Sequence, residues 1–124
     1  MVLIFGGAYQ GKLDFAKELS SGKNSVYRCP FEEIPDFSAD IIDGYHAAVL
    51  ALIRSGIDPC AYTSEHLGDF AQKVIICDDI SSGVVPLDPE MRAWREAVGR
   101  CMGILSGNAD SVYRVFCGIV TQIK

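Results

Sequence analysis

A glycine-rich loop near the N-terminus, placed between an apolar run and a helical pattern, limits the possible folds of this chain more than any other feature. Residues 2–5 are continuously apolar, which is typical of a strand buried on both faces. The segment G-G-A-Y-Q-G-K at residues 6–12 follows at once and fits G-x-x-x-x-G-K. Residues 12–19 then have the apolar spacing of a helix. This order of strand, loop and helix predicts a phosphate-binding loop.

The loop has the residue types that phosphate binding requires. Glycines let the backbone curl so that its N–H groups point at phosphate oxygens, and the N-terminus of the following helix adds partial positive charge. Lys12 is expected to bridge the β- and γ-phosphates of ATP or GTP and to act in catalysis. We predict that the nucleotide is bound by Gly6, Gly7, Ala8, Tyr9, Gln10, Gly11, Lys12 and Leu13.

One position departs from the usual pattern. The residue after the lysine is normally Ser or Thr, whose hydroxyl binds Mg²⁺, but here it is Leu13. Asp14 is a poor substitute, because adjacent helical residues point about 100° apart. Mg²⁺ is the metal that such a site would hold, yet Leu13 favours nucleotide binding over efficient Mg²⁺-dependent transfer.

Carboxylates follow two of the expected strands. Asp43 ends the strand expected at residues 39–43, and Asp78 and Asp79 follow the strand expected at residues 73–77. In phosphate-loop proteins a carboxylate in such a position holds Mg²⁺ directly or through water. We predict Asp43 as a metal ligand and Asp79 as a catalytic residue. The alternative is a solvated acid in a turn, since Asp favours turns.

The remaining pattern alternates strands with helices. Further strands are expected at residues 25–29, 111–117 and 121–123, and further helices at 45–53, 64–70 and 89–105. Ser64 and Asp88 are the expected N-caps of the last two helices. Such alternation predicts one α/β domain over residues 1–124, with a mainly parallel sheet and helices on both faces.

Composition excludes several classes of protein. The net charge of −5 argues against a nucleic-acid partner, whose phosphates require basic residues. No apolar run approaches the roughly 18 residues of a membrane span, and residues 1–5 are too short for a signal-peptide core. We therefore expect a cytoplasmic protein. The five cysteines lack a C-x-x-C pattern, which favours core packing, and Cys29, Cys77 and Cys117 each end an apolar run.

Several segments together resemble the adenosylcobinamide kinase/adenosylcobinamide-phosphate guanylyltransferase family. G-G-A and G-K of the loop match that family's G-G-A-R-S-G-K-S, and D-D-I-S-S-G-V-V-P at residues 78–86 is similar to its N-E-V-G-x-G-I-V-P. R-A-W-R-E-A-V-G-R at residues 92–100 resembles R-x-[FY]-R-D-x-x-G-R, and residues 109–124 resemble the terminal A-D-x-V…G…I-K. The likeness covers about two-thirds of the chain, and the middle is shortened.

The resemblance implies a RecA-like P-loop domain that phosphorylates a corrinoid in cobalamin biosynthesis and then transfers GMP to that phosphate through a guanylylated histidine. It also implies a small symmetric homo-oligomer, commonly a trimer. The family's histidine lies in an H-x-x-x-R-P stretch, which residues 27–40 lack. The family role does not transfer to His46 or His66, so the guanylyl-histidine step is not expected.

Two functions remain open at this point. One is a cobinamide kinase-like enzyme, and the other is a catalytically inactive P-loop module for binding or regulation. Arg92, Arg95 and Arg100 suit either phosphate binding or pairing with neighbouring acids. Trp94 suits either an oligomer interface or packing into its own core.

Overall fold

Six strands and four helices make up the part of the chain that the computed structural model describes, residues 1–20, 25–80 and 88–124. Residues 81–86 of the segment that resembles N-E-V-G-x-G-I-V-P lie outside the described residues. The strands are β1 (Val2–Gly6), β2 (Val26–Arg28), β3 (Ile41–Asp43), β4 (Val74–Asp78), β5 (Ser111–Phe116) and β6 (Ile119–Gln122). The helices are α1 (Lys12–Leu19), α2 (Tyr45–Arg54), α3 (Pro59–Glu65) and α4 (Pro89–Asn108).

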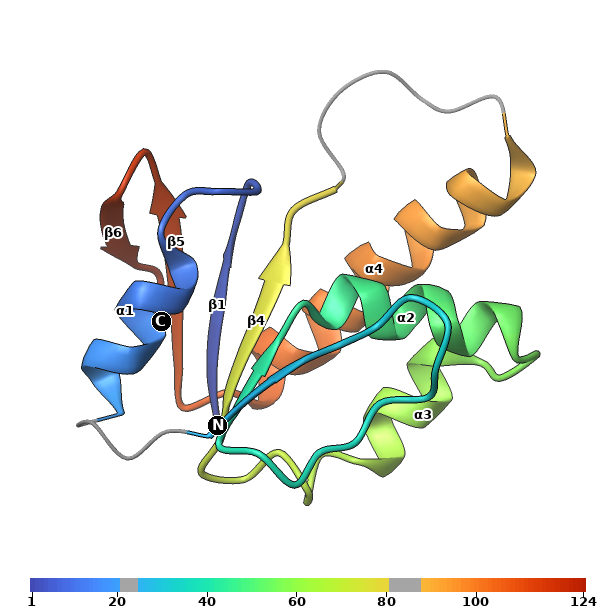
Figure 1. The fold of residues 1–124 in the computed structure, drawn as a ribbon, viewed down its shortest axis with the longest axis horizontal. Coiled ribbons are helices and arrows are strands. Elements are labelled where there is room, and N and C mark those ends of the chain that lie inside the picture. Colours follow the sequence, from blue (N-terminus) through green and yellow to red (C-terminus); the bar gives the residue numbers. More distant parts are fainter. Residues whose placement is uncertain (21–24, 81–87) are drawn as a thin grey trace.

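The strands form one mixed sheet in the order β2-β3-β4-β1-β5-β6. All neighbouring pairs are parallel except β5 and β6, which form an antiparallel hairpin. The first strand, β1, therefore lies in the interior of the sheet between β4 and β5 (Figure 1). Because parallel strands end at the same edge, the carboxyl ends of β1 to β4 meet where the glycine loop leaves β1.

Helices cover both faces of the sheet, as the sequence predicts. α1 lies on one face, and α2, α3 and α4 lie on the other (Figure 1). Side chains alternate between faces along a strand, so Leu3 and Ile4 of β1 join different core clusters. The α1 side is formed by Ile4, Ala16, Ile41, Val74, Ile76 and Val115. The α/β class with a mainly parallel sheet is confirmed.

The third helix differs from its prediction. The expected helix at residues 64–70 with Ser64 as N-cap is wrong, because α3 begins at Pro59 and ends at Glu65. Asp58 is its N-cap, and the Asp58 carboxylate accepts hydrogen bonds from the N–H groups of Cys60 at 3.0 Å and Ala61 at 3.4 Å. A capping carboxylate followed by Pro at the first helical position fixes the helix start here.

The same combination correctly predicts the start of α4. The Asp88 carboxylate accepts from the N–H of Glu90 at 2.8 Å, and Pro89 is the first residue of the helix. α4 continues to Asn108, beyond the expected end at residue 105.

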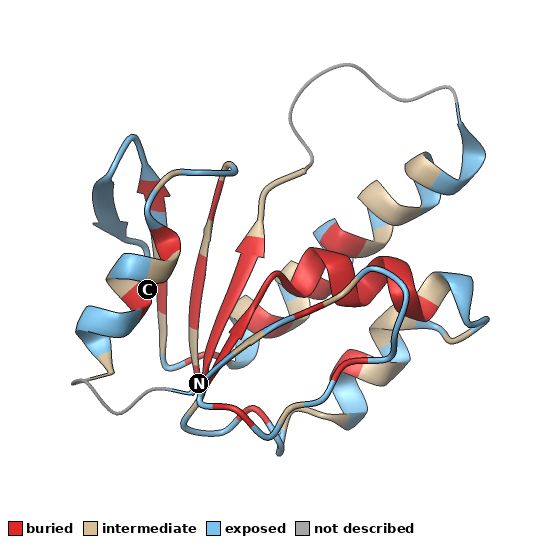
Figure 2. Cartoon of the chain, in the orientation of Figure 1, coloured by how far each residue is buried: buried red, intermediate tan, exposed pale blue. Residues whose placement is uncertain are grey.

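Burial is concentrated in β3, β4 and α2 (Figure 2). Cys29, Cys77 and Cys101 are buried, as core packing predicts, and burial raises the pKa of the Cys29 thiol to about 12. The expectation for Cys117 is wrong, because it lies exposed in the β5–β6 turn with a positive φ of 49°. Within the three described ranges, none of the helices combines the length and apolar character needed to cross a membrane.

Candidate functional site

The glycine loop leaves β1 at a point where the backbone is tightly enclosed. A Cβ atom on Gly6 would lie 2.2 Å from the carbonyl oxygen of Val115 in β5, so only glycine fits. Gly11 has a φ of 91° and is the N-cap residue of α1, which has no side-chain cap among the described residues. A left-handed backbone at this position favours glycine. The first glycine therefore allows β1 to pack against β5, and the last turns the chain into α1.

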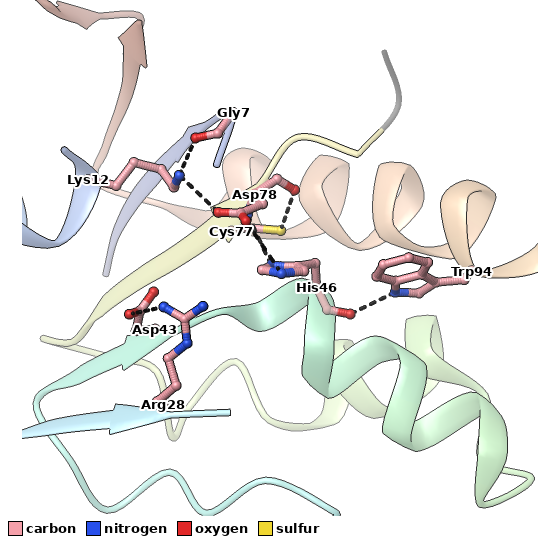
Figure 3. A network of polar contacts seen from close by, with 8 residues as sticks. All are labelled: Gly7, Lys12, Arg28, Asp43, His46, Cys77, Asp78 and Trp94. Atoms are coloured by element: carbon pink, nitrogen blue, oxygen red, sulfur yellow. Dashed lines mark hydrogen bonds and ion pairs between the residues drawn. The ribbon is translucent and has the colours of Figure 1, made fainter. Parts of the chain in front are cut away.

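Lys12 turns back over the loop from the first turn of α1. Only 6% of its side chain is exposed. Its Nζ donates a hydrogen bond to the carbonyl oxygen of Gly7 at 2.5 Å and forms an ion pair with Oδ1 of Asp78 at 2.8 Å (Figure 3). The ammonium group is thus fixed between the loop and the end of β4.

A hollow of about 220 Å³ lies beside this ammonium. It brings together most of the predicted nucleotide-binding loop with three residues from the ends of neighbouring strands. Its lining is Ala8, Tyr9, Gln10, Gly11, Lys12, Leu13, Asp14, Arg28, Asp43 and Asp78. Among the described residues, neither Gly6 and Gly7 nor the three arginines of α4 belong to this lining. Crevices outside the carboxyl ends of parallel strands are the usual binding sites of open α/β sheets.

The carboxylate that faces Lys12 belongs to Asp78 rather than to Asp79, the residue that the sequence singles out. Strand register explains this arrangement, since Asp78 is the β4 partner of Gly6, where the loop begins. Asp79 contributes its backbone N–H, which donates to the carbonyl oxygen of Gly6 at 2.7 Å. A catalytic role for Asp79 stays a prediction.

Asp43 forms an ion pair that sequence reasoning did not anticipate. Arg28 and Asp43 are register partners at the ends of β2 and β3. Nη1 of Arg28 lies 2.9 Å from Oδ2 of Asp43, and the carboxylate is buried while 72% of the arginine side chain is exposed (Figure 3). A basic residue near the end of the strand expected at residues 25–29 was the only sequence signal for this pair.

His46 contacts Asp78 through both ring nitrogens. The Asp78 N–H donates to Nδ1 at 3.2 Å, and Nε2 lies 3.5 Å from Oδ2 of the same residue. An accepting Nδ1 places the proton of the neutral ring on Nε2. Burial lowers the pKa of His46, and the Asp78 carboxylate opposes this shift. Trp94 donates from Nε1 to the His46 carbonyl oxygen at 2.7 Å, so both residues pack within the chain.

The donor set is a poor fit for Mg²⁺. The side chain of Leu13 has no ligand atom, Asp43 is paired with Arg28, and Asp78 is paired with Lys12. In the ranges that the structure describes, no group of three His, Cys, Asp or Glu residues could hold a metal ion. Asp43 as a metal ligand stays a prediction, and because Arg28 holds its Oδ2, a metal ion would have to use Oδ1 or displace the arginine.

Together the fold and the loop define an α/β protein with a candidate phosphate-binding hollow at the carboxyl edge of its sheet. No protein-family model matches the chain, and no curated protein is similar enough in sequence to count as a match.

Proposed function

We propose that the hollow binds the phosphate chain of ATP or GTP and that the chain is a RecA-like P-loop domain. The observation that carries this proposal is the placement of Lys12, whose ammonium group is held at the glycine loop beside the hollow. A phosphate there would meet a fixed positive charge and the N-terminal N–H groups of α1, which no described side chain caps. A cytoplasmic location, where ATP and GTP are available, is part of the same proposal.

The enzymatic form of the proposal is a cobinamide kinase-like phosphotransferase of cobalamin biosynthesis. Its support is the resemblance of the loop and of residues 92–100 to that family. Asp78, beside Lys12 at the hollow, is a carboxylate that could accept the proton of a substrate hydroxyl, as a catalytic aspartate does in kinases. A corrinoid is the substrate that the resemblance suggests.

The guanylyl-histidine step does not belong to this proposal. A nucleophilic histidine must reach the phosphorus atom of the nucleotide. His46 is buried, its Nδ1 accepts from the Asp78 backbone and its carbonyl group is held by Trp94. His66 lies on another part of the molecule, stacked on Tyr62 with ring centroids 3.9 Å apart. Neither histidine lines the hollow among the residues that the structure describes.

A catalytically inactive P-loop module for binding or regulation is the second candidate. Leu13 favours it, because its side chain cannot bind the metal that phosphoryl transfer normally uses. The pairing of Lys12 with Asp78 favours it as well, since the lysine is already neutralised. The two candidates share the binding step and differ only in turnover.

Calorimetry with ATP and with GTP, each with and without Mg²⁺, tests the shared step. We expect binding of at least one nucleotide in the micromolar to millimolar range, with little gain from Mg²⁺. A chain that binds neither nucleotide under any of these conditions would contradict both candidates. Where binding is found, release of ADP or GDP in the presence of cobinamide distinguishes the kinase from the inactive module.

A homo-oligomer, commonly a trimer in the resembling family, is the proposed assembly. Trp94 is half-buried against Phe31 and His46 of its own chain, so it offers little surface to a partner. The β5–β6 hairpin is the better candidate, because Phe116, Ile119 and Val120 are exposed there. Exposed apolar residues on an edge strand favour association with another chain.

A further inference from the structure

We propose that Arg28 is a second phosphate-binding cation of the hollow, and that it supplies the charge compensation for which P-loop proteins generally use Mg²⁺. This inference rests on the proposed function, because it concerns the same hollow. It assigns a ligand class: a chain of two or more phosphates that extends from Lys12 to Arg28.

Arg28 lies beside the end of β3 and the start of α2. Its guanidinium is paired with Asp43 of the neighbouring strand at 2.9 Å. Its Nε would lie 4.0 Å from a Cβ atom on Gly44, the left-handed N-cap residue of α2. The arginine therefore lies over the end of β3 and the start of α2, and it lines the hollow together with Lys12.

Arg28 can bind phosphate without leaving Asp43. A guanidinium has five N–H donors in a planar fork, and the ion pair uses Nη1. With 72% of the side chain exposed, the rest of the fork is open to a ligand. Asp43 then acts as the residue that orients the arginine.

The charges around the hollow explain why a second cation is needed. The lining includes Lys12 and Arg28, but also the carboxylates of Asp14, Asp43 and Asp78. Lys12 alone is neutralised by Asp78 and cannot balance a polyphosphate. In P-loop proteins the metal ion bridges the β- and γ-phosphates and neutralises the charge that develops there. Here Asp43, at a strand end where a metal ligand is expected, holds an arginine.

The spacing of the strands indicates which ligands reach both cations. Lys12 is paired at the end of β4, and Arg28 belongs to β2, two strands away in the sheet. Two strand spacings amount to about 10 Å. A single phosphate in the glycine loop would meet Lys12 only, whereas a triphosphate can extend toward Arg28. Arg28 should therefore favour triphosphates over orthophosphate.

Calorimetry in EDTA, with inorganic tripolyphosphate and orthophosphate as probes, tests this assignment. We expect the natural chain to bind tripolyphosphate without metal and Arg28→Ala to weaken that binding about tenfold or more. Arg28→Lys should recover only part of the affinity, because lysine lacks the planar fork. Arg54→Ala is the matched control, since Arg54 is paired with Glu90 away from the hollow. Circular dichroism verifies that each variant is folded.

The outcomes separate this inference from the proposed function. If Lys12→Ala weakens tripolyphosphate binding but Arg28→Ala binds like the natural chain, the role of Arg28 is wrong and the phosphate site stands. An absolute requirement for Mg²⁺ in the natural chain would equally overturn the role of Arg28. If the natural chain binds none of tripolyphosphate, ATP and GTP, with or without Mg²⁺, both proposals fail together.

Discussion

Oδ1 of Asp78 lies 2.8 Å from Nζ of Lys12, so the lysine of the phosphate loop is already paired with a carboxylate at the end of β4. The other carboxylate oxygen faces Nε2 of His46 at 3.5 Å. A bound phosphate would have to share Lys12 with this carboxylate. The strength of phosphate binding therefore depends on Asp78 as well as on the loop.

Replacement of Asp78 by Asn should strengthen phosphate binding. The change removes one negative charge beside Lys12, and we expect an affinity for tripolyphosphate about fivefold or more higher at low salt. The unfolding temperature should fall, because the largely buried Lys12 loses its counter-ion. Asp79→Asn is the matched control. Calorimetry measures the affinity of both variants, and a larger gain in Asp79→Asn would show that the charge of Asp79, not that of Asp78, opposes phosphate binding.

Replacement of Lys12 by Ala should weaken binding of ATP or GTP by about 1.5–3 kcal/mol, the scale of a hydrogen bond to a charged group. Lys17→Ala is the control, because Lys17 is exposed on the same helix. Titration calorimetry measures the difference between the two variants. Equal affinities of a folded Lys12→Ala variant and the natural chain would remove the loop as a binding site.

Stability should fall in mildly acidic solution because of His46. Burial lowers its pKa below the ordinary value of about 6.5, so between the two pKa values the unfolded chain binds a proton that the folded chain does not. The stabilising contribution is full above about pH 6.5 and is lost as the pH falls through the folded pKa. Thermal unfolding from pH 8 to pH 5 should show this loss in the natural chain and in His66→Gln. If His46→Gln loses as much thermal stability as the natural chain over this pH range, groups other than His46 cause the loss.

Gly6→Ala should destabilise the fold by more than about 2 kcal/mol, because its Cβ would lie 2.2 Å from a backbone oxygen of β5. Gly7→Ala is the comparison, since its nearest contact would be Cγ of Gln10 at an ordinary 3.6 Å. Urea unfolding of the two variants measures the difference. Equal stabilities would mean that β1 and β5 separate easily at this point.

Light scattering at micromolar concentration tests the proposed oligomer. We expect a mass above that of one chain for the natural protein. Ile119→Lys should shift the population toward monomer, because it replaces an exposed apolar side chain of the proposed interface with a charged one. Thr121→Lys on the same strand is the control for added charge alone. A monomer at every concentration would contradict the assembly proposed for this chain.

The general fold could be predicted because its signals are local. An apolar run before the glycine loop and capped helices after it indicate strands and helices without knowledge of their neighbours. The start of α3 follows the same local rule as the start of α4. Asp58 and Pro59 form the same N-terminal signal as Asp88 and Pro89, and this signal outweighs Ser64 as a helix cap.

The details of the site depend on strand register, which the sequence does not encode locally. Two adjacent aspartates look equivalent, yet pairing of β1 with β4 places Asp78 opposite Gly6. Likewise, the pairing of β2 with β3 joins Arg28 to Asp43, although residues 29–42 separate them in the sequence. Local sequence patterns therefore predict which residues belong to a strand, loop or helix of the site. They do not predict the contacts between residues of different elements.

The interior position of β1 has a consequence for how the chain reaches its native state. Val2 pairs with Val74 and with Ser111, so both neighbours of the first strand come from much later in the sequence. Contacts between such distant residues carry a large loop-closure entropy and slow folding. During synthesis, β1 remains without its β5 partner until the residues of β5 have left the ribosome. The glycine loop is made well before β5, so its packing against Val115 forms only after that later strand is available.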